Sequence, residues 1–357
     1  MFVKTLRRNL FSKTFIHRAA PKNLLDFYEP LSIIEASDEN LRLYQLAKDR
    51  GELDYLRIIR SRISNSRFRF KRTLTNEVSE LFLNKNCVLL IGNAGCGKST
   101  LVKYLFVKCI QDEYKIPIKI ELRYLSDYGG SLFDYIINEV FKFNNFTDEL
   151  NVAKRLLEQD KFVFFFDGYD EISTKNREKI TKDIDDFITL YPDNKYLLTS
   201  RPFTDLDLLP SFHNYYVSDL IGSEIDNFIH KQLGESNEEL IEKILKSIRS
   251  NESRSFRSFL SNPLLLSMYI LSFQNYADIP DKKSIFYRQV FDALFSLHDS
   301  MSKLAFVREK QSGISKEQFE FILRIFCFVS FFEEKFIFSV EYLHLKFNQI
   351  KSIKKTI

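Results

Sequence analysis

The glycine-rich turn Gly92–Ser99 has the residue types and the spacing of a phosphate-binding loop. Its order, Gly-Asn-Ala-Gly-Cys-Gly-Lys-Ser, fits the pattern G-x-x-x-x-G-K-[ST]. In such a turn the backbone N–H groups close around a phosphate, and the N-terminus of the following helix adds partial positive charge. Lys98 can reach the β- and γ-phosphates, while the Ser99 hydroxyl can bind Mg²⁺. The residues expected to bind the nucleotide are Gly92, Asn93, Ala94, Gly95, Cys96, Gly97, Lys98, Ser99 and Thr100.

A second set of reactive side chains follows the apolar run Phe162–Phe166. The run leads into Asp-Gly-Tyr-Asp-Glu at 167–171, so three carboxylates stand at the end of a predicted buried strand. Asp167 is expected to join Ser99 in the shell of the Mg²⁺ ion. Asp170 or Glu171, one turn further on, can polarise the attacking water as general base. Alone, such a turn would be a solvated loop, but the glycine turn upstream favours the catalytic interpretation.

A third polar group stands at the end of the run Tyr196–Pro202. The run reads Tyr-Leu-Leu-Thr-Ser-Arg-Pro, and open α/β sheets bind their ligands at the carboxyl ends of strands. Arg201 is expected to read the γ-phosphate, because a bidentate guanidinium contact would distinguish ATP from ADP. The alternative is a surface arginine that caps a turn.

The start of the same segment argues against guanine nucleotides. Asn194-Lys195-Tyr196-Leu197 resembles the beginning of the guanine-reading pattern N-K-x-D. Leu197, however, stands where an aspartate would have to accept hydrogen bonds from the base. ATP and ADP, with Mg²⁺, are therefore the expected cofactors.

Strands and helices must bring these three groups together. Short apolar runs alternate with amphipathic helical stretches, which predicts a mainly parallel sheet covered on both faces. The predicted strands are Cys87–Ile91, Ile116–Leu125, Phe162–Phe166, Tyr196–Thr199 and Asn214–Val217. Helical periodicity then predicts helices over 223–233, 238–250, 263–273, 283–297 and 316–332. The fold class is α/β, with a three-layer, parallel-sheet P-loop ATPase domain over 86–220 followed by an all-helical domain over 221–357.

Positive charge is concentrated before the glycine turn. Residues 1–72 hold 16 Lys and Arg against 8 Asp and Glu, and residues 1–85 are predicted to be basic and mostly helical, with an extended piece at Phe27–Ile34. The densest part, Arg60–Arg72, is interleaved with Phe68 and Phe70, which would suit the backbone and bases of a nucleic acid. A solvated linker face is the favoured alternative.

The composition also indicates the cellular compartment in which the protein is expected. No segment is apolar over the roughly 20 residues that a bilayer requires, so no membrane contact is expected. The four cysteines form no C-x-x-C pair and the five histidines show no metal-ligand spacing, which predicts a reducing cytoplasm and no structural metal. Residues 1–20 are basic, amphipathic and free of acids, so a mitochondrial transit peptide is the alternative.

The three motifs together resemble the NACHT family of signal-transduction ATPases, a STAND-type P-loop NTPase group. The resemblance is carried by the segments GNAGCGKST, FVFFFDGYDEI and YLLTSRP. In addition, Asn262–Leu266 looks like the family's N-P-L-L-L stretch. The resemblance implies that Pro263 lies against the adenine and that the Arg201 strand lies between the other two motif strands. It also implies a switch in which ADP holds a closed state and ATP supports self-association, with trigger and effector proteins that the sequence does not identify.

The Phe-, Lys- and Ile-rich composition looks most like the bacterial branch of this family, whose members are similar to anti-phage defence proteins. The winged-helix and C-terminal sensor parts are not recognisable, and Tyr342-Leu343-His344 matches the winged-helix histidine motif only by coincidence. A fragment, a truncated gene or a partner-dependent subunit is expected. The leading hypothesis is a regulatory ATPase with slow turnover. A nucleic-acid-dependent P-loop ATPase and a nucleotide-binding scaffold without hydrolysis are the alternatives.

Overall fold

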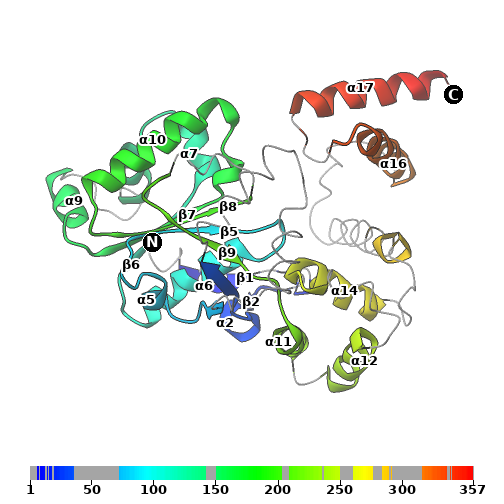
Figure 1. Ribbon diagram of the computed structural model, residues 1–357, viewed down its shortest axis with the longest axis horizontal. Coiled ribbons are helices and arrows are strands. Elements are labelled where there is room, and N and C mark those ends of the chain that lie inside the picture. Colours follow the sequence, from blue (N-terminus) through cyan, green and yellow to red (C-terminus); the bar gives the residue numbers. More distant parts are fainter. Residues whose placement is uncertain are drawn as a thin grey trace, which may run out of the picture.

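The protein folds around one mixed β-sheet, with further helices grouped at one end of it in the computed structural model (Figure 1). The structure describes residues 6, 7, 9–12, 14, 16, 17, 20–35, 72–141, 150–202, 209–234, 237–249, 260–275, 284–288, 291, 316–335, 338 and 340–356. The predicted basic cluster falls at residues 60–72 and lies outside the described residues, except for the backbone of Arg72.

Seven strands of the described residues form the sheet, in the order β4-β3-β9-β5-β8-β7-β6. They are β3 (Ser32–Glu35), β4 (Arg72–Leu74), β5 (Cys87–Ile91), β6 (Ile116–Glu121), β7 (Phe162–Asp167), β8 (Lys195–Ser200) and β9 (His213–Val217). The five strands from β9 to β6 pair in parallel, whereas β3 pairs antiparallel with both β4 and β9. The strand before Arg201, β8, lies between β5 and β7, which confirms the predicted order.

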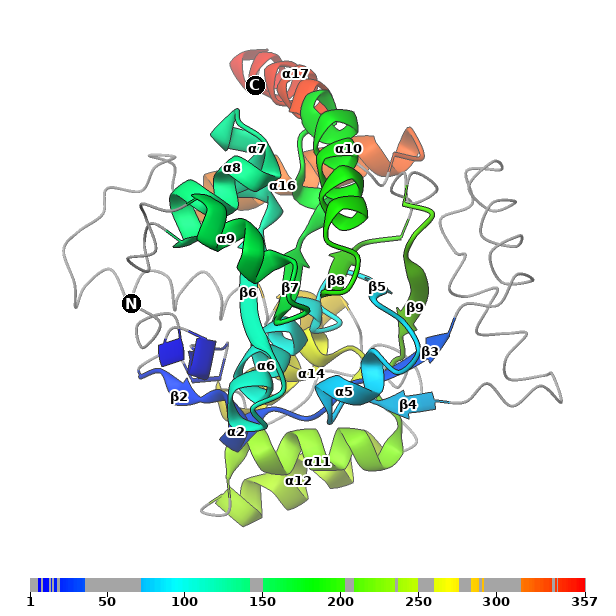
Figure 2. The ribbon, with the colours of Figure 1, turned by 90° about the vertical axis from the view of Figure 1, so that its left-hand side faces the viewer.

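Both faces of the central strands are buried, as their continuous apolar sequences require. Successive side chains of a strand point to opposite faces, so Val88 and Leu90 belong to one core while Leu89 and Ile91 belong to the other. The first core packs against α6 (Lys98–Gln111), and the second against α7 (Leu122–Tyr128), α8 (Leu132–Tyr135) and α10 (Thr174–Leu190). Figure 2 shows the sheet between these layers, with α9 (Leu150–Leu157) beside α8.

One strand is shorter than the sequence predicted. The run Ile116–Leu125 was expected to be extended throughout, but β6 ends at Glu121 and α7 begins at Leu122. Leu122 and Leu125 are both buried, and a spacing of three residues places them on one face of a helix. The helix therefore buries both leucines, where a strand would point them to opposite faces.

The described residues before 86 are more extended than the predicted mostly helical region. They include the short helices α2 (Leu24–Phe27) and α5 (Val78–Leu81), a small pair of strands, β1 (Phe11–Ser12) and β2 (Lys22–Asn23), and the two sheet strands β3 and β4. The predicted extended piece at Phe27–Ile34 is wrong at Phe27, which ends α2, but Tyr28 is extended and a strand begins at Ser32. The N-terminal segment thus completes the antiparallel edge of the main sheet, and the domain boundaries at 85 and 220 stay predictions.

Helices follow the sheet, as the sequence predicted. They are α11 (Gly222–Leu233), α12 (Glu238–Arg249), α14 (Pro263–Asn275), α16 (Lys316–Phe332) and α17 (Val340–Thr356). The predicted helix at 283–297 is described only at 284–288 and 291, where it is helical. Figure 1 shows α11, α12 and α14 against the sheet body, with α16 and α17 further from it. Among the described residues, no helix is both long enough and apolar enough to cross a membrane.

Candidate nucleotide-binding site

The glycine turn lies between the end of β5 and the start of α6, as the phosphate-binding interpretation requires. Gly97 has a φ of 98°, a left-handed conformation that glycine adopts without steric cost, and α6 begins at the next residue. The Lys98 ammonium folds back over the turn and donates to the carbonyl oxygens of Gly92 (2.5 Å) and Asn93 (3.1 Å). Both acceptors are neutral, and among the described residues no carboxylate pairs with Lys98. Its charge is therefore left for an anionic ligand.

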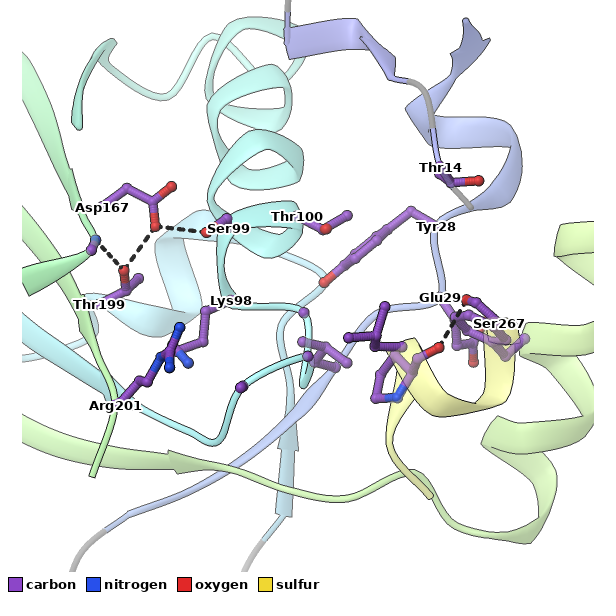
Figure 3. A pocket seen from close by; sticks show the side chains of 18 of the residues that line it. Thr14, Tyr28, Glu29, Lys98, Ser99, Thr100, Asp167, Thr199, Arg201 and Ser267 are labelled. Carbon is purple, nitrogen blue, oxygen red and sulfur yellow. Dashed lines mark hydrogen bonds between the residues drawn. The ribbon is translucent and has the colours of Figure 1, made fainter. Parts of the chain in front are cut away.

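Ser99 and Asp167 meet at the carboxyl edge of the sheet. Asp167 Oδ1 accepts hydrogen bonds from Ser99 Oγ (3.1 Å) and from Thr199 Oγ1 (2.8 Å) (Figure 3). Thr199 Oγ1 in turn accepts from the Gly168 N–H group (2.9 Å), so β7 and β8 are tied together at their ends. Asp167 is only 8% exposed. A hydroxyl and a carboxylate held this closely fit the oxygen ligands that Mg²⁺ prefers.

Asp170 and Glu171 have different partners. The segment Tyr169–Glu171 forms one 3₁₀ turn after β7. Asp170 binds Arg201 twice, through the guanidinium Nε (2.9 Å) and through the backbone N–H group (3.1 Å). Glu171 is more exposed and faces the Arg123 guanidinium at 3.6 Å. Asp170 therefore holds Arg201 in place, which leaves Glu171 as the more accessible general-base candidate.

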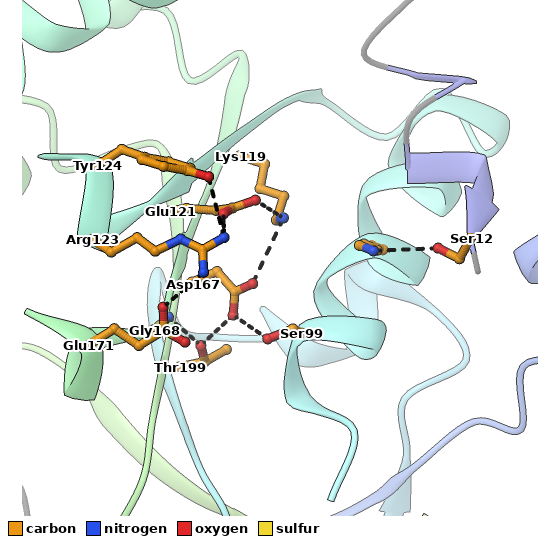
Figure 4. A network of polar contacts seen from close by, with 11 residues as sticks. Ser12, Ser99, Lys119, Glu121, Arg123, Tyr124, Asp167, Gly168, Glu171 and Thr199 are labelled. Carbon is orange, nitrogen blue, oxygen red and sulfur yellow. Dashed lines mark hydrogen bonds and ion pairs between the residues drawn. The ribbon is translucent and has the colours of Figure 1, made fainter. Parts of the chain in front are cut away.

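A chain of charges connects Asp167 to Glu171 along the outer side of the site (Figure 4). Lys119 Nζ lies 3.8 Å from Asp167 Oδ2 and 3.1 Å from Glu121 Oε1, and Arg123 binds the other oxygen of Glu121 at 2.5 Å. Partial burial alone would raise the pKa of Glu121, but Lys119 and Arg123 outweigh it and hold that pKa below its ordinary value. Lys119 on the edge strand β6 and Arg123 in the first turn of α7 thus place compensating positive charge behind the acidic turn.

The first turn of α14 is bonded directly to the glycine turn. Asn262 Nδ2 donates to the Ala94 carbonyl (3.1 Å), and the Leu264 N–H group donates to the Gly95 carbonyl (3.1 Å). Asn262 Oδ1 also accepts from the N–H groups of Leu264 (3.0 Å) and Leu265 (3.3 Å), which caps the helix. The helical part of the chain therefore touches the backbone that would hold a phosphate.

These elements enclose a pocket of about 400 Å³, within the usual range for ligand sites. The residues that line it are Thr14, Phe27, Tyr28, Glu29, Leu31, Ala94, Gly95, Gly97, Lys98, Ser99, Thr100, Asp167, Gly168, Asp170, Glu171, Thr199, Arg201, Phe228, Gln232, Pro263, Leu264 and Ser267. In Figure 3, Lys98, Asp167 and Arg201 lie at one end, while Tyr28, Glu29 and Ser267 lie at the other.

Most of the predicted site residues meet in this pocket, with three exceptions. Gly92, Asn93 and Cys96 belong to the turn but are not among the residues that line the pocket. The carbonyl oxygens of Gly92 and Asn93 accept hydrogen bonds from the Lys98 ammonium. The Cys96 side chain is buried. Burial raises the pKa of the Cys96 thiol, which makes it a poor nucleophile. Pro263 lines the pocket, and its place against a base stays a prediction.

Sequence reasoning did not single out several residues of the site. Thr199 stands within the third motif, so its position at a strand end was an available signal. Asn262 precedes a proline at a helix start, a pattern typical of a helix cap. No local sequence pattern points to Lys119, Arg123 or Gln232 as site residues, because they make their contacts with distant segments of the chain.

The charges of this pocket fit a metal-bound triphosphate. Lys98 has no carboxylate partner within the part of the chain that the structure describes, and the N-terminus of α6 faces the cavity. Ser99 with Asp167 offers oxygen ligands for Mg²⁺. The former guanine-pattern residue Asn194 is buried instead, where it binds the Leu157 carbonyl and the Phe162 N–H group. Asn194 therefore has a structural role, at the opposite end of β8 from Arg201 and outside the pocket.

The sequence profile of the NACHT domain matches residues 86–236. Among solved structures, the Walker-type ATPase PABY2304 of Pyrococcus abyssi is similar at 14% identity, over 78% of this chain and 87% of that chain, with a TM-score of 0.39. C. elegans PCH-2 is similar at 14% identity, over 73% and 71%, with a TM-score of 0.35. Domain III of the Thermotoga maritima replication initiation protein DnaA is similar at 12% identity, over 76% and 95%, with a TM-score of 0.33.

Similarities of this strength say nothing about activity, and none of the curated proteins is similar enough to count as a relative. The profile match spans the glycine turn, the acidic turn and the Arg201 segment, which are the parts that the pocket brings together. Residues 86–236 therefore match the NACHT domain in sequence, and the same residues hold the parallel sheet strands and the glycine turn that line the pocket.

Proposed function

We propose that this chain is a regulatory ATPase of the NACHT type, which binds ATP and ADP with Mg²⁺ and hydrolyses ATP slowly. The observation that carries the proposal is that the pocket is lined both by the sheet and by α14, which is hydrogen-bonded to the glycine turn. A ligand in this pocket contacts both parts of the chain. A difference between ATP and ADP can therefore change how the two parts are held together.

Each residue of the pocket has a place in this proposal. Lys98 binds the terminal phosphates, and Ser99 with Asp167 holds the Mg²⁺ ion, which supplies positive charge to the phosphates when it is bound. Glu171 orients the attacking water and accepts its proton. Arg201, held by Asp170, contacts the γ-phosphate and so reports whether it is present.

The switch controls self-association in this proposal, and the setting that its resemblance favours is bacterial antiviral defence in the cytoplasm. A shift from a mostly closed to a mostly open population needs about 5.5 kcal/mol of differential binding. The γ-phosphate contacts of Lys98 and Arg201 supply part of this energy, and an activating partner supplies the rest. The trigger and the effector of this switch are unidentified partner proteins.

Nucleotide binding is tested by calorimetry on the full chain with ATP and ADP in the presence of Mg²⁺. Lys98→Ala should abolish binding, because the pocket then lacks the cation that reaches both the β- and the γ-phosphate. The matched control is Lys108→Ala, on the same helix, where the lysine pairs with Asp112 at 2.8 Å on the surface. The control should bind as the wild type does. Wild-type affinity in Lys98→Ala would contradict the proposal.

Hydrolysis and self-association need separate measurements. Glu171→Gln should bind ATP normally but turn it over about a hundredfold more slowly, because the general base is lost while the pocket keeps its shape. The mass of the wild-type protein, measured by light scattering in ATP and in ADP, should be larger in ATP. Equal masses would refute the switch, and unchanged turnover in Glu171→Gln would refute the assignment of the base.

A further inference from the structure

The last turns of α16 carry an exposed aromatic face. Phe328, Phe331 and Phe332 are 64%, 68% and 72% exposed. Their spacing of three and four residues places them on one side of the helix. The rings of Phe328 and Phe332 lie 4.7 Å apart, so the exposed rings are contiguous. These three residues together are called the phenylalanine face.

Another side of α16 is already packed within the chain. Phe326 is buried, and its ring contacts those of Tyr342 and Phe347 on α17. A surface helix of a globular protein needs one apolar side to pack against the rest of the chain. α16 has that side at Phe326, so the phenylalanine face is a second apolar side.

The area of the phenylalanine face fits one half of a protein interface. An aromatic side chain presents roughly 150–250 Å², and two-thirds of this in three phenylalanines is roughly 300–500 Å². Stable interfaces bury about 800 Å² on each partner, and a little more than half of it, about 450 Å², is apolar. The exposed rings therefore supply the apolar area that one side of a stable dimer needs.

The charges beside the face favour a second copy of this chain as its occupant. The run 325–332 contains no charged residue. Arg324 stands one turn before Phe328 and lies 4.0 Å from Glu320, and it is largely exposed. Glu334 follows the end of α16, is exposed and has no ion pair among the described residues. One surface thus carries a cation at one end and an anion at the other, so two such surfaces are complementary when they run antiparallel.

We propose that the phenylalanine face is the interface with a second copy of this chain, and that the two α16 helices pair antiparallel about a two-fold axis. With the axis at the level of Val329, Arg324 of each copy lies opposite Glu334 of the other, five residues to either side. Phe328 of one copy then lies between Phe328 and Phe332 of the other. The rings interlock in this arrangement, as side chains of paired helices do.

This pairing does not depend on the proposed nucleotide switch. No residue of α16 is among those that line the pocket, and α16 lies further from the sheet body than α11, α12 and α14 do (Figure 1). The dimer should therefore form without nucleotide and in ADP. The larger assembly proposed for the ATP state would be built from such dimers.

Sedimentation velocity on the full chain tests the dimer. Without nucleotide, at about 50 μM, the wild type should have twice the mass of one chain, because interfaces of this size bind with micromolar affinity or better. Phe328→Glu combined with Phe332→Glu should raise the dissociation constant at least roughly a hundredfold, because two aromatic anchors are lost. The matched control is Leu190→Glu at the end of α10, where the leucine is also 64% exposed, and it should keep the wild-type mass. A monomeric wild type at this concentration, or a dimer in the double variant, would overturn the proposal.

An exchange of charges tests whether the occupant is a second copy. Arg324→Glu alone should weaken the dimer roughly tenfold, because the new carboxylate faces Glu334 of the other copy. Adding Glu334→Arg to the same chain should restore the wild-type dissociation constant, and failure to restore it would overturn the antiparallel pairing. A wild-type monomer that binds phosphatidylcholine vesicles through Phe328 and Phe332 would assign the face to a lipid surface and overturn the second copy.

Discussion

The two ends of the pocket are built in different ways: Lys98, Ser99 and Asp167 form one, called the phosphate end after the proposed function, and Tyr28, Glu29 and Ser267 form the other, called the base end. The phosphate end comes from three strand ends of one sheet, and its side chains are bonded to one another, as Asp167 is to Ser99 and Thr199. The base end joins three segments that lie far apart in the sequence, at 27–31, 228–232 and 263–267. A local motif thus suffices for the first end, whereas the second exists only when the helices pack against the N-terminal segment.

The two ends meet at Gly95, where the largest effect is expected. Gly95 has a φ of 77°, and a Cβ atom there would lie 2.7 Å from Leu264 Cβ and 3.0 Å from Asn262 Oδ1. Gly95→Ala should separate α14 from the glycine turn. We expect the free energy of unfolding to fall by about 2–4 kcal/mol, from left-handed strain and overpacking together. The affinity for ATP should fall at least roughly tenfold as well.

The matched control for this prediction is Gly129→Ala. Gly129 has nearly the same φ, 78°, but nothing lies within 4 Å of the added atom. It should show only the backbone strain, about 1–2 kcal/mol, and should bind ATP as the wild type does. Chemical denaturation and calorimetry on both variants give the comparison. Equal losses of binding in the two would mean that the contact with α14 does not shape the phosphate end.

The difference between the two ends also explains how far the sequence could predict this molecule. The phosphate end was predictable because Gly92–Ser99 and Asp167–Glu171 are contiguous, and each follows an apolar strand whose bounds agree with the structure to within one residue. Lys98, Ser99 and Asp167 therefore converge as expected. The Arg201 strand was placed by the resemblance, and its pairing between β5 and β7 confirms it.

The rest could not be predicted, for a physical reason. β3 pairs with β4 and β9, which lie far along the chain, so the short sequence Ser32–Glu35 does not reveal its place at the sheet edge. Gln232 is one polar residue on an amphipathic helix, and such residues are commonly solvated. Only its burial against the Phe27 carbonyl gives it a role, and burial is decided by tertiary packing.

A smaller effect is expected from Asn262→Asp, which separates the cap of α14 from its bond to the glycine turn. Aspartate keeps the acceptor for the Leu264 and Leu265 N–H groups, so the helix start should stay intact. It loses the donor to the Ala94 carbonyl and places a carboxylate oxygen beside it. We expect the affinity for ATP to fall by roughly five- to tenfold, the equivalent of about 1 kcal/mol.

The control for Asn262→Asp is Asn237→Asp. Asn237 Nδ2 makes the same kind of bond, to the Leu233 carbonyl at 2.7 Å, but Asn237 does not line the pocket. This variant should lose some stability and keep its affinity for ATP. If Asn262→Asp bound ATP as tightly as the wild type does, the hydrogen bond between the two parts of the chain would be structural only.

The smallest effect concerns pH and the charges behind the phosphate end. Lys119 and Arg123 hold the pKa of Glu121 below its ordinary value of 4.5, so the unfolded chain binds this proton before the folded protein does. The stability that Glu121 contributes is then complete above pH 4.5 and is lost as the pH falls through the lower pKa of the folded state. In Glu121→Gln, denaturation measured from pH 6 down to about pH 3 should show a shallower loss of stability than in the wild type.

The control for this prediction is Glu158→Gln. It removes an exposed carboxylate that has no ion pair among the described residues, and it should leave the wild-type slope unchanged. A wild-type slope in Glu121→Gln would mean that the ion pairs of Glu121 with Lys119 and Arg123 add no stability to the folded state.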